Sequence, residues 1–397
     1  MNSIKKRKIF SILENYMEDS EIIVLTGFRR VGKTCVMQYI YDGISSKNKI
    51  FFDLESPVNQ RIFTDINYEN IKLSLVQHGI DFKQKAHIFL DEIQNIRNLP
   101  SVIKYLFDHN NIKFYLTGSS SFYLKNQFAE SLSGRKYIFE LYPLDFEEFL
   151  WFKDVSLSLD VGYDLLIGLY REYLLYGGFP SVVLESSPDK KIRKIDDVLG
   201  SYFDLDVTNF ANFRNNQNLK DLLFLLSSRV GSKLDITKIA EILGVVRPTI
   251  YEYLDFFEQT YLIHRLKPLS GSRDVQIKNI PKMYFNDTGI LNRVGQISEG
   301  QLFENMVFNQ LFTKLHYTGI YSRLYEVMNY YQLKTGAEID FIIDKKNAFE
   351  VKVHGTNYDL KRLVRICNNL KEISEHKIIS LNKVKTPNPD IIYPFNI

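Results

Sequence analysis

Residues 27–34 read Gly-Phe-Arg-Arg-Val-Gly-Lys-Thr, which completes the pattern G-x-x-x-x-G-K-[ST]. Gly27 and Gly32 allow the backbone to curl until its N–H groups face a phosphate, and the N-terminus of a following helix adds positive charge. Lys33 would reach the β- and γ-phosphates, and the Thr34 hydroxyl would be a ligand of Mg²⁺. The pattern therefore predicts binding of a nucleoside triphosphate, against the alternative of a chance match. Two further residues complete the predicted nucleotide site, namely Arg30 and Cys35.

Two carboxylates end the apolar run 86–90, which predicts a strand. In nucleotide hydrolases that carry this glycine-rich motif, the first such carboxylate holds the Mg²⁺ shell, a role that falls to Asp91. A second carboxylate directly beyond it can polarise the attacking water as a general base, and here that residue is Glu92. The alternative is a strand that ends in two solvated acids.

Hydroxyls and one arginine extend this predicted site. The run 112–116 predicts a third strand, followed by Thr117 and Ser119. Because ligands bind at the carboxyl ends of parallel strands, either hydroxyl could orient the water or the γ-phosphate. Arg135 precedes the predicted strand 137–141 and is a candidate arginine finger. It would act either on the nucleotide site of a neighbouring subunit or, by folding back, on the site of its own chain. The alternative for Arg135 is a surface residue.

The elements around the first motif support its interpretation. Residues 22–25 are an apolar run typical of a buried strand, and residues 35–40 can form a helix. Strand, glycine-rich loop and helix is the context that this phosphate-binding motif requires. Cys35, directly after the motif, is expected to be a small buried residue.

At this point the chain resembles the bacterial and archaeal AAA-type ATPases that carry a C-terminal domain of uncharacterised function. The resemblance implies an α/β fold with five parallel strands and the phosphate loop beside the middle of the sheet, a helical lid, a winged helix and a nuclease-like end domain. It also implies ATP as the nucleotide. The choice of ATP over GTP rests on the resemblance, because no residue that would recognise the base is identifiable in the sequence. The residues that carry it are Gly27–Thr34, Leu90–Gln94, Leu116–Ser120, Gly134-Arg135, Leu144–Phe149 and Tyr176–Pro180.

Length and composition fit this layout. The 397 residues are 45% hydrophobic and 24% charged, which is ordinary for a soluble globular protein. The net charge of +3 favours neither a strong nucleic-acid field nor an acidic repellent surface. No apolar run approaches the ~18 residues of a membrane span, and the two distant cysteines fit a reduced cytosol. The expected domains are 1–150 (ATPase), 151–230 (helical lid), 231–290 (winged helix) and 298–397 (nuclease-like).

The charges of the predicted winged helix give opposite indications about DNA binding. We expect a helix at 237–243, a second carrying Ile250, and wing strands at 261–266 and 281–285. The second helix sets one arginine against three acids, which repels phosphate. The wing supplies basic residues, so that nonspecific contact with double-stranded DNA stays open beside a packing role. The acids are Glu252, Asp255 and Glu258, and the wing residues are Arg265, Lys267, Arg273 and Lys278.

Residues 336–353 contain two alternating runs around a polar turn, a hairpin pattern. An odd turn, such as three residues centred on Lys345, places Asp340 opposite Glu350 and puts Lys352 on the same face, whereas a two-residue turn separates the acids. Paired carboxylates and a lysine on one face are typical of metal-dependent phosphodiester hydrolysis.

This hairpin resembles the restriction-endonuclease-like PD-(D/E)xK fold, with Ile339 where the proline would stand. The resemblance implies that Glu304, Asp340 and Glu350 hold a metal and that Lys352 is catalytic. The alternative is an inactive nuclease-derived scaffold that binds a partner. Three hypotheses follow: a Mg²⁺-dependent ATPase, an ATP-switched DNA nuclease, and a regulatory module with a protein partner. A homo-oligomer is compatible with each.

Overall fold

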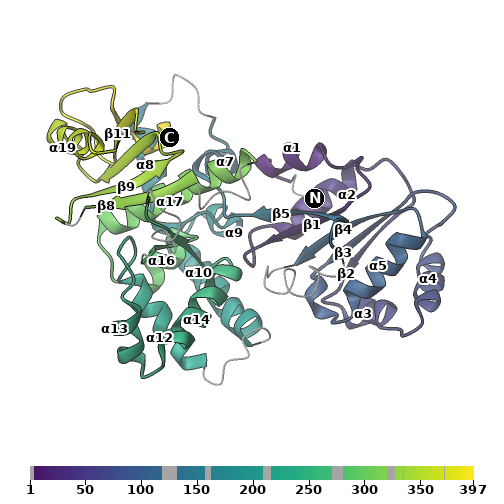
Figure 1. The fold of residues 1–397 in the computed structure, drawn as a ribbon. Coiled ribbons are helices and arrows are strands. Elements are labelled where there is room, and N and C mark those ends of the chain that lie inside the picture. The colour runs from purple at the N-terminus through teal and green to yellow at the C-terminus, as the bar shows by residue number, and fades with distance from the viewer. Residues whose placement is uncertain are drawn as a thin grey trace. The chain divides into compact units, whose positions relative to one another are not determined.

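The computed structural model describes residues 4–118, 132–156, 162–208, 216–270, 280–319, 327–333, 335–370 and 372–397. The chain divides into two compact units (Figure 1). Unit 1 comprises residues 1–142, 201–212 and 259–261, and unit 2 comprises residues 143–200, 213–258 and 262–397. The predicted phosphate loop lies in unit 1, and the predicted nuclease-like hairpin lies in unit 2.

Unit 1 contains a five-stranded parallel sheet, which confirms the predicted α/β class. The strand order is β2-β3-β4-β1-β5, so that β1 lies beside the central strand. The runs predicted as strands are buried on both faces of the sheet, as parallel strands covered by helices require. The strands are β1 (Ile22–Gly27), β2 (Lys49–Asp53), β3 (Ala86–Asp91), β4 (Ile112–Gly118) and β5 (Lys136–Leu141).

Helices cover both faces of this sheet (Figure 1). On one face, α3 (Pro57–Phe63), α4 (Tyr68–Gln77) and α5 (Leu99–His109) pack against side chains such as Ile88 and Phe114. The other face carries α1 (Lys8–Glu14) and α2 (Lys33–Gly43). There the Phe89 ring meets Tyr41 of α2 edge-on at 5.3 Å and stacks on Tyr115 at 4.2 Å. These layers fix the ends of β1 and β3, where the phosphate motif and the two acids lie.

A late segment of the chain also belongs to unit 1. Residues 202–207 form a turn of π-helix, η2 (Tyr202–Val207), a rare geometry that is frequent at functional sites. Tyr202 stacks on Phe28 of the phosphate loop with 5.3 Å between ring centroids, and its hydroxyl lies 2.8 Å from the Thr260 hydroxyl. The phosphate loop is therefore packed against residues almost two hundred positions away in sequence.

The first part of unit 2 is helical, in agreement with the predicted pattern. An antiparallel strand pair, β6 (Ile263–Leu266) and β7 (Lys282–Phe285), follows α14. Two helices and an antiparallel strand pair thus occur near the predicted positions within 235–285. The helices are α7 (Phe146–Phe152), α8 (Tyr163–Tyr176), α9 (Pro180–Val183), α10 (Pro188–Ser201), α12 (Asn216–Ser227), α13 (Ile236–Leu243), α14 (Arg247–Gln259) and α16 (Thr288–Val294).

The end of unit 2 holds a second five-stranded sheet of order β12-β11-β10-β9-β8 (Figure 1). Helix α17 (Glu299–Tyr317) contacts β10, and α19 (Asn357–Cys367) packs on β9 and β11. The strands are β8 (Met328–Gln332), β9 (Glu338–Ile343), β10 (Asn347–Lys352), β11 (Glu375–Ser380) and β12 (Ile391–Ile392). Among the described residues, no helix has both the length and the apolar character needed to cross a membrane.

Candidate functional site

The loop after β1 has the backbone geometry that its glycines allow. Gly27 has φ 149°, and a Cβ there would lie 2.2 Å from the Leu141 carbonyl oxygen. Gly32, with φ 101°, is the N-cap of α2. Arg30 between them also adopts a positive φ of 65°. A side chain at position 27 would meet fixed backbone, so this loop can pass β5 only with glycine there.

Lys33 is buried within this loop. Its Nζ donates to the carbonyl oxygens of Gly27 at 3.1 Å and Phe28 at 3.0 Å. An ammonium has three N–H donors, so these two bonds aim the side chain and leave a third donor for a ligand oxygen. Burial lowers the pKa of the Lys33 ammonium, while the charge of Glu92 opposes that shift. The predicted phosphate-binding lysine is thus held at the mouth of the loop.

The two predicted magnesium ligands meet at the carboxyl ends of β1 and β3. The Thr34 hydroxyl donates to Asp91 Oδ2 at 2.7 Å, and the Thr117 hydroxyl donates to Asp91 Oδ1. Burial raises the pKa of the Asp91 carboxyl, and both hydroxyls act against that shift. A hydroxyl and a carboxylate at one point are the oxygen donors that Mg²⁺ takes beside a bound nucleotide, so these residues fit that ion.

Glu92 follows in a strained conformation. Its φ of 56° and ψ of 51° lie in the left-handed region, which is uncommon for a residue with a side chain and clusters at functional sites. The Glu92 N–H donates to the Thr117 hydroxyl at 3.1 Å, and the Gln94 amide donates to Glu92 Oε2. Thr117 is fully buried and therefore positions both acids.

A buried ion pair at the loop escaped the sequence prediction. Arg29 Nε lies 2.9 Å from Asp206 Oδ2 of η2, and Glu55 lies 4.0 Å from the same guanidinium. Burial raises the pKa of the Asp206 carboxyl against the opposing effect of Arg29. The charge of Glu92 also acts on Arg29. Arg29 is therefore anchored in the phosphate loop by an acid from a distant part of the chain.

The other predicted residues of this site fall elsewhere. Arg135 precedes β5 and pairs with Asp108 at 2.9 Å, at the amino end of a strand parallel to β1. Six strand residues separate that end from the phosphate loop, roughly 17 Å or more, so Arg135 does not reach the loop of its own chain. Cys35 is exposed on α2, contrary to the expectation of burial, because the buried face of that helix is formed by Lys33, Val36, Met37 and Ile40. Ser119 lies outside the described residues.

The end-domain hairpin has the predicted register. Ile343 pairs with Asn347 and Phe341 with Phe349, which leaves a three-residue turn centred on Lys345. Asp344 and Lys345 of the turn both have positive φ. Asp340 therefore lies opposite Glu350, as the parity argument requires, and Asp340 Oδ2 accepts from the Val351 N–H at 2.8 Å.

The four predicted nuclease residues nevertheless divide into two ion clusters. Glu350, almost fully buried, contacts Lys352 Nζ at 2.8 Å and also the Arg362 guanidinium. Asp340 and Glu304 lie instead around the ammonium of Lys282, a residue of β7. Within the part of the chain that the structure describes, no three His, Cys, Asp or Glu side chains are grouped to hold a metal. The predicted metal set of Glu304, Asp340 and Glu350 is therefore not assembled around one point.

The predicted wing is less basic than its sequence indicates. Arg265 of β6 donates to Glu258 Oε2 at 2.8 Å and to Asp255 Oδ1 at 2.7 Å. Both acids come from α14, the helix whose charge the sequence analysis weighed against DNA. Arg273 and Lys278 lie outside the described residues. Arg265 is neutralised within the fold, which weakens the case for phosphate contacts.

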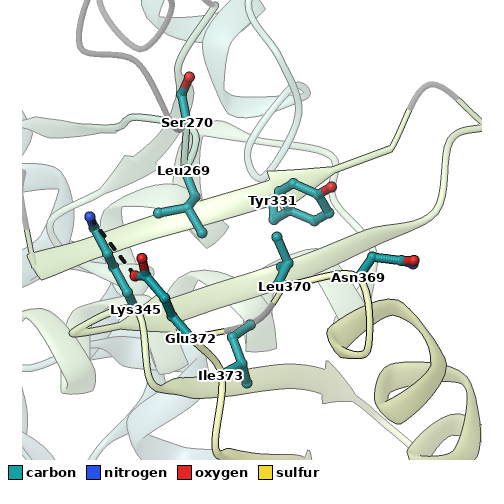
Figure 2. A pocket seen from close by; sticks show the side chains of 8 residues that line it. All are labelled: Leu269, Ser270, Tyr331, Lys345, Asn369, Leu370, Glu372 and Ile373. Atoms are coloured by element: carbon teal, nitrogen blue, oxygen red, sulfur yellow. Dashed lines mark ion pairs between the residues drawn. The ribbon is translucent and has the colours of Figure 1, made fainter.

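A separate pocket of about 230 Å³ opens in the end domain (Figure 2). Apolar side chains form most of its lining, and Lys345 and Glu372 pair at 4.0 Å at one side. The pocket shares no lining residue with either ion cluster. Its lining residues are Leu269, Ser270, Tyr331, Lys345, Asn369, Leu370, Glu372 and Ile373.

Distant similarities to solved structures exist. A Walker-type ATPase of Pyrococcus abyssi is 15% identical, with 73% of this chain and 95% of that chain covered and a TM-score of 0.48. The Aeropyrum pernix ORC1 protein in complex with DNA is 12% identical, with 73% and 92% covered and a TM-score of 0.34.

Relatives of similar length occur in archaea and bacteria. An uncharacterized protein of Methanocaldococcus jannaschii is 28% identical over 94% of this chain and 81% of its own length. An uncharacterized protein of Haemophilus influenzae is 29% identical over 91% of this chain and 92% of its own length. The similarity thus extends over both units.

Family models divide the chain into three parts. Residues 299–396 and 167–301 match two models described as domains of unknown function, DUF4143 and DUF8612. Residues 19–150 match the model described as AAA domain. This match coincides with the parallel sheet, the phosphate loop and the paired acids described above. Residues 19–150 form an AAA-type P-loop domain.

Proposed function

We propose that this protein binds ATP with Mg²⁺ and hydrolyses it in the AAA-type domain. The observation that carries the proposal is the convergence of Lys33, Thr34, Asp91 and Glu92 at the carboxyl ends of β1 and β3. These residues supply a phosphate-binding cation, two magnesium ligands and a general base. Lys33 and Thr34 begin α2, which packs on the sheet, and Asp91 and Glu92 stand at the end of β3.

Binding uses the loop and the start of α2. Backbone N–H groups of the loop and the N-terminus of α2 face the β- and γ-phosphates. Lys33 adds its remaining N–H donor to them. Mg²⁺, held by Thr34 and Asp91, would draw charge from the β- and γ-phosphate oxygens. The neutral Gln94 amide and the Thr117 hydroxyl keep the acids in place without adding charge.

Glu92 performs the proton transfer of the hydrolysis step. Its carboxylate accepts a proton from a water that attacks the γ-phosphorus. The bond between that phosphorus and the β,γ-bridging oxygen breaks, and its electrons remain on ADP. Glu92 then returns the proton to solvent or product. The Gln94 amide holds one carboxylate oxygen, so the other faces the water.

We infer that Arg29 supplies the positive charge expected of an arginine finger. It lies in the phosphate loop of the same chain, between Gly27 and Lys33, and it is held there by Asp206. A guanidinium beside the γ-phosphate stabilises the charge that spreads over its oxygens in the transition state. Asp206 holds the guanidinium through Nε, which fixes its direction. Arg135 stays a candidate only for action on a neighbouring subunit.

We expect Arg29→Ala to lower the kcat of ATP hydrolysis by about 10- to 100-fold, the value of one charge-assisted hydrogen bond in the transition state. Affinity for ADP should change little, because ADP lacks the γ-phosphate. Asp206→Asn should lower kcat less, since the guanidinium stays present but loses its guide. Phosphate release and ADP titration measure both effects. Arg61→Ala, an exposed arginine of α3, is the matched control. An unchanged kcat in Arg29→Ala would remove Arg29 from the mechanism.

We infer that the remaining domains are a winged helix and a nuclease-derived end domain. The nucleotide state of the AAA-type domain would control how these domains bind a partner. The pairing of Arg265 with Asp255 and Glu258 favours a protein partner over double-stranded DNA. The alternative, an ATP-switched nuclease, has the Asp340–Glu350 register in its favour. Homo-oligomerisation would be required for Arg135 to act.

ATP turnover by the full chain, with and without double-stranded DNA, tests this proposal. We expect Mg²⁺-dependent release of phosphate at a rate that DNA leaves within about twofold, because the net charge is only +3 and Arg265 is neutralised within the fold. A rate that rises several-fold with DNA and loses that rise at high salt would move the partner from protein to DNA. Absence of turnover in either condition would refute hydrolysis by this chain.

A further inference from the structure

A buried lysine of β7, Lys282, lies among three acids of the end domain. Lys282 Nζ lies 3.4 Å from Glu338 Oε2, 3.6 Å from Glu304 Oε1 and 4.0 Å from Asp340 Oδ1. Only 1% of this side chain is exposed. The three acids come from α17 and β9, and the lysine comes from β7. The ammonium therefore lies beside Glu304 and Asp340, two of the three residues predicted to hold a metal.

The distances suit an ammonium shared among several acids. A divalent cation binds carboxylate oxygens at about 2.0–2.6 Å and needs them turned toward one point. Tyr284 instead donates to Glu304 Oε1 at 2.8 Å, and the Tyr330 ring lies 5.4 Å from the ammonium. These neighbours hold the lysine and one of the acids.

The charges of the cluster support this arrangement. Burial would lower the pKa of Lys282, but Glu304, Asp340 and Glu338 raise it above its ordinary value, which keeps the ammonium charged. The ammonium thus offsets part of the negative charge of the three acids that surround it.

The remaining acid of the predicted nuclease set is neutralised separately. Glu350 is held by Lys352 and Arg362, both on the end-domain sheet and its helix α19. Glu350 contacts the cations of Lys352 and Arg362, whereas Asp340 lies near Lys282. Asp340 and Glu350 therefore face each other without sharing a cation. The predicted register is therefore present, but each acid already has a positively charged partner from the protein.

We propose that Lys282 is a built-in cation which takes the place of a divalent metal, so that the end domain holds a structural ion cluster in place of a hydrolytic metal centre. Without the ammonium, Glu304, Glu338 and Asp340 would lose their shared cation, and we expect them to turn toward a divalent metal that replaces it. This inference concerns unit 2 alone and does not depend on ATP hydrolysis in unit 1.

The proposal is tested by a Mn²⁺ titration of the nucleotide-free full chain. Electron paramagnetic resonance measures the free ion, and the bound Mn²⁺ is obtained by difference. We expect Lys282→Ala to bind one more equivalent of Mn²⁺ than the wild type, and Lys282→Ala/Asp340→Asn to lose that equivalent. Lys282→Met, which keeps the stem and removes the charge, should gain less because its side chain still fills the space. Subtraction between variants removes any Mn²⁺ bound at the phosphate loop.

If the lysine variants fail to fold, proteins that keep Lys282 still test the proposal. Wild type and Asp340→Asn should bind equal amounts of Mn²⁺, and neither Mn²⁺ nor Mg²⁺ should support cleavage of double-stranded DNA. Wild-type Mn²⁺ binding that Asp340→Asn abolishes would overturn the proposal. So would metal-dependent cleavage of DNA that Glu350→Ala removes. A folded Lys282→Ala protein that gains no Mn²⁺ would also contradict it.

Discussion

Replacement of Lys33 by alanine is expected to weaken binding of ATP by about one to two orders of magnitude, since one charge-assisted hydrogen bond of ~1.5–3 kcal/mol to phosphate is lost. Lys33 is aimed by the Gly27 and Phe28 carbonyls, so no other described side chain stands in the same place. Hydrolysis should fall with binding. Calorimetric titration with ATP measures the first effect directly.

Two controls separate loss of a phosphate ligand from loss of the fold. Lys33→Met keeps most of the buried stem and should bind ATP as poorly as Lys33→Ala. Lys104→Ala removes an exposed lysine from α5 and should bind ATP as the wild type does. Because burial lowers the pKa of Lys33, removing its charge should not destabilise unit 1. Normal ATP affinity in Lys33→Ala would exclude this loop as the nucleotide site.

Glu92→Gln should separate hydrolysis from binding. The amide has the shape of the carboxylate but cannot accept a proton, so we expect kcat to fall by about 10²- to 10⁴-fold. Affinity for ATP should stay within about threefold or rise slightly, because a negative charge near the γ-phosphate is removed. Single-turnover hydrolysis together with ATP titration distinguishes the two effects.

The structure supplies a specific complication for this variant. Gln94 donates its amide to Glu92 Oε2, so Glu92→Gln also changes that contact. Gln94→Ala should therefore lower kcat only modestly, since the carboxylate remains. Glu18→Gln, an exposed acid before β1, is the matched surface control. Equal loss of turnover in Gln94→Ala and Glu92→Gln would indicate that position of the water, and not proton transfer, limits the rate.

The parts of the site that lie close together in sequence were predictable. Lys33 and Thr34 follow a glycine pattern whose chemistry is local, and Asp91 and Glu92 end a strand whose apolar run is plain. The parity of a short hairpin likewise placed Asp340 opposite Glu350 once the turn was odd. In each case the backbone between the residues is a single strand or turn, so spacing determines geometry.

The parts that depend on tertiary packing were not predictable. Arg29 and Asp206 are 177 positions apart, and only the return of η2 to the loop joins them. Lys282 lies within the run 281–285 that predicted a strand, where nothing in the sequence distinguished it. Its role emerges because β7, α17 and β9 meet at one point. Neither the Arg29–Asp206 pair nor the Lys282 cluster has a regular spacing in the sequence, so no periodicity could have revealed them.

Arg135 illustrates the same limit from the other side. Its position before a predicted strand suggested a finger, but parallel strands place that end of β5 far from the loop after β1. Strand direction, which the sequence alone left implicit, decides the matter. The arginine that lies at the phosphate end was already inside the motif, at a variable position that the pattern ignores.

The most direct test of the central claim is release of phosphate from ATP by the purified full chain, measured in Mg²⁺ and again after chelation with EDTA. Sustained turnover in Mg²⁺ that EDTA stops and that Glu92→Gln lacks is the predicted result. ATP that binds in the wild type but is never hydrolysed, with or without Mg²⁺, would contradict the account and leave a nucleotide-binding domain without catalysis.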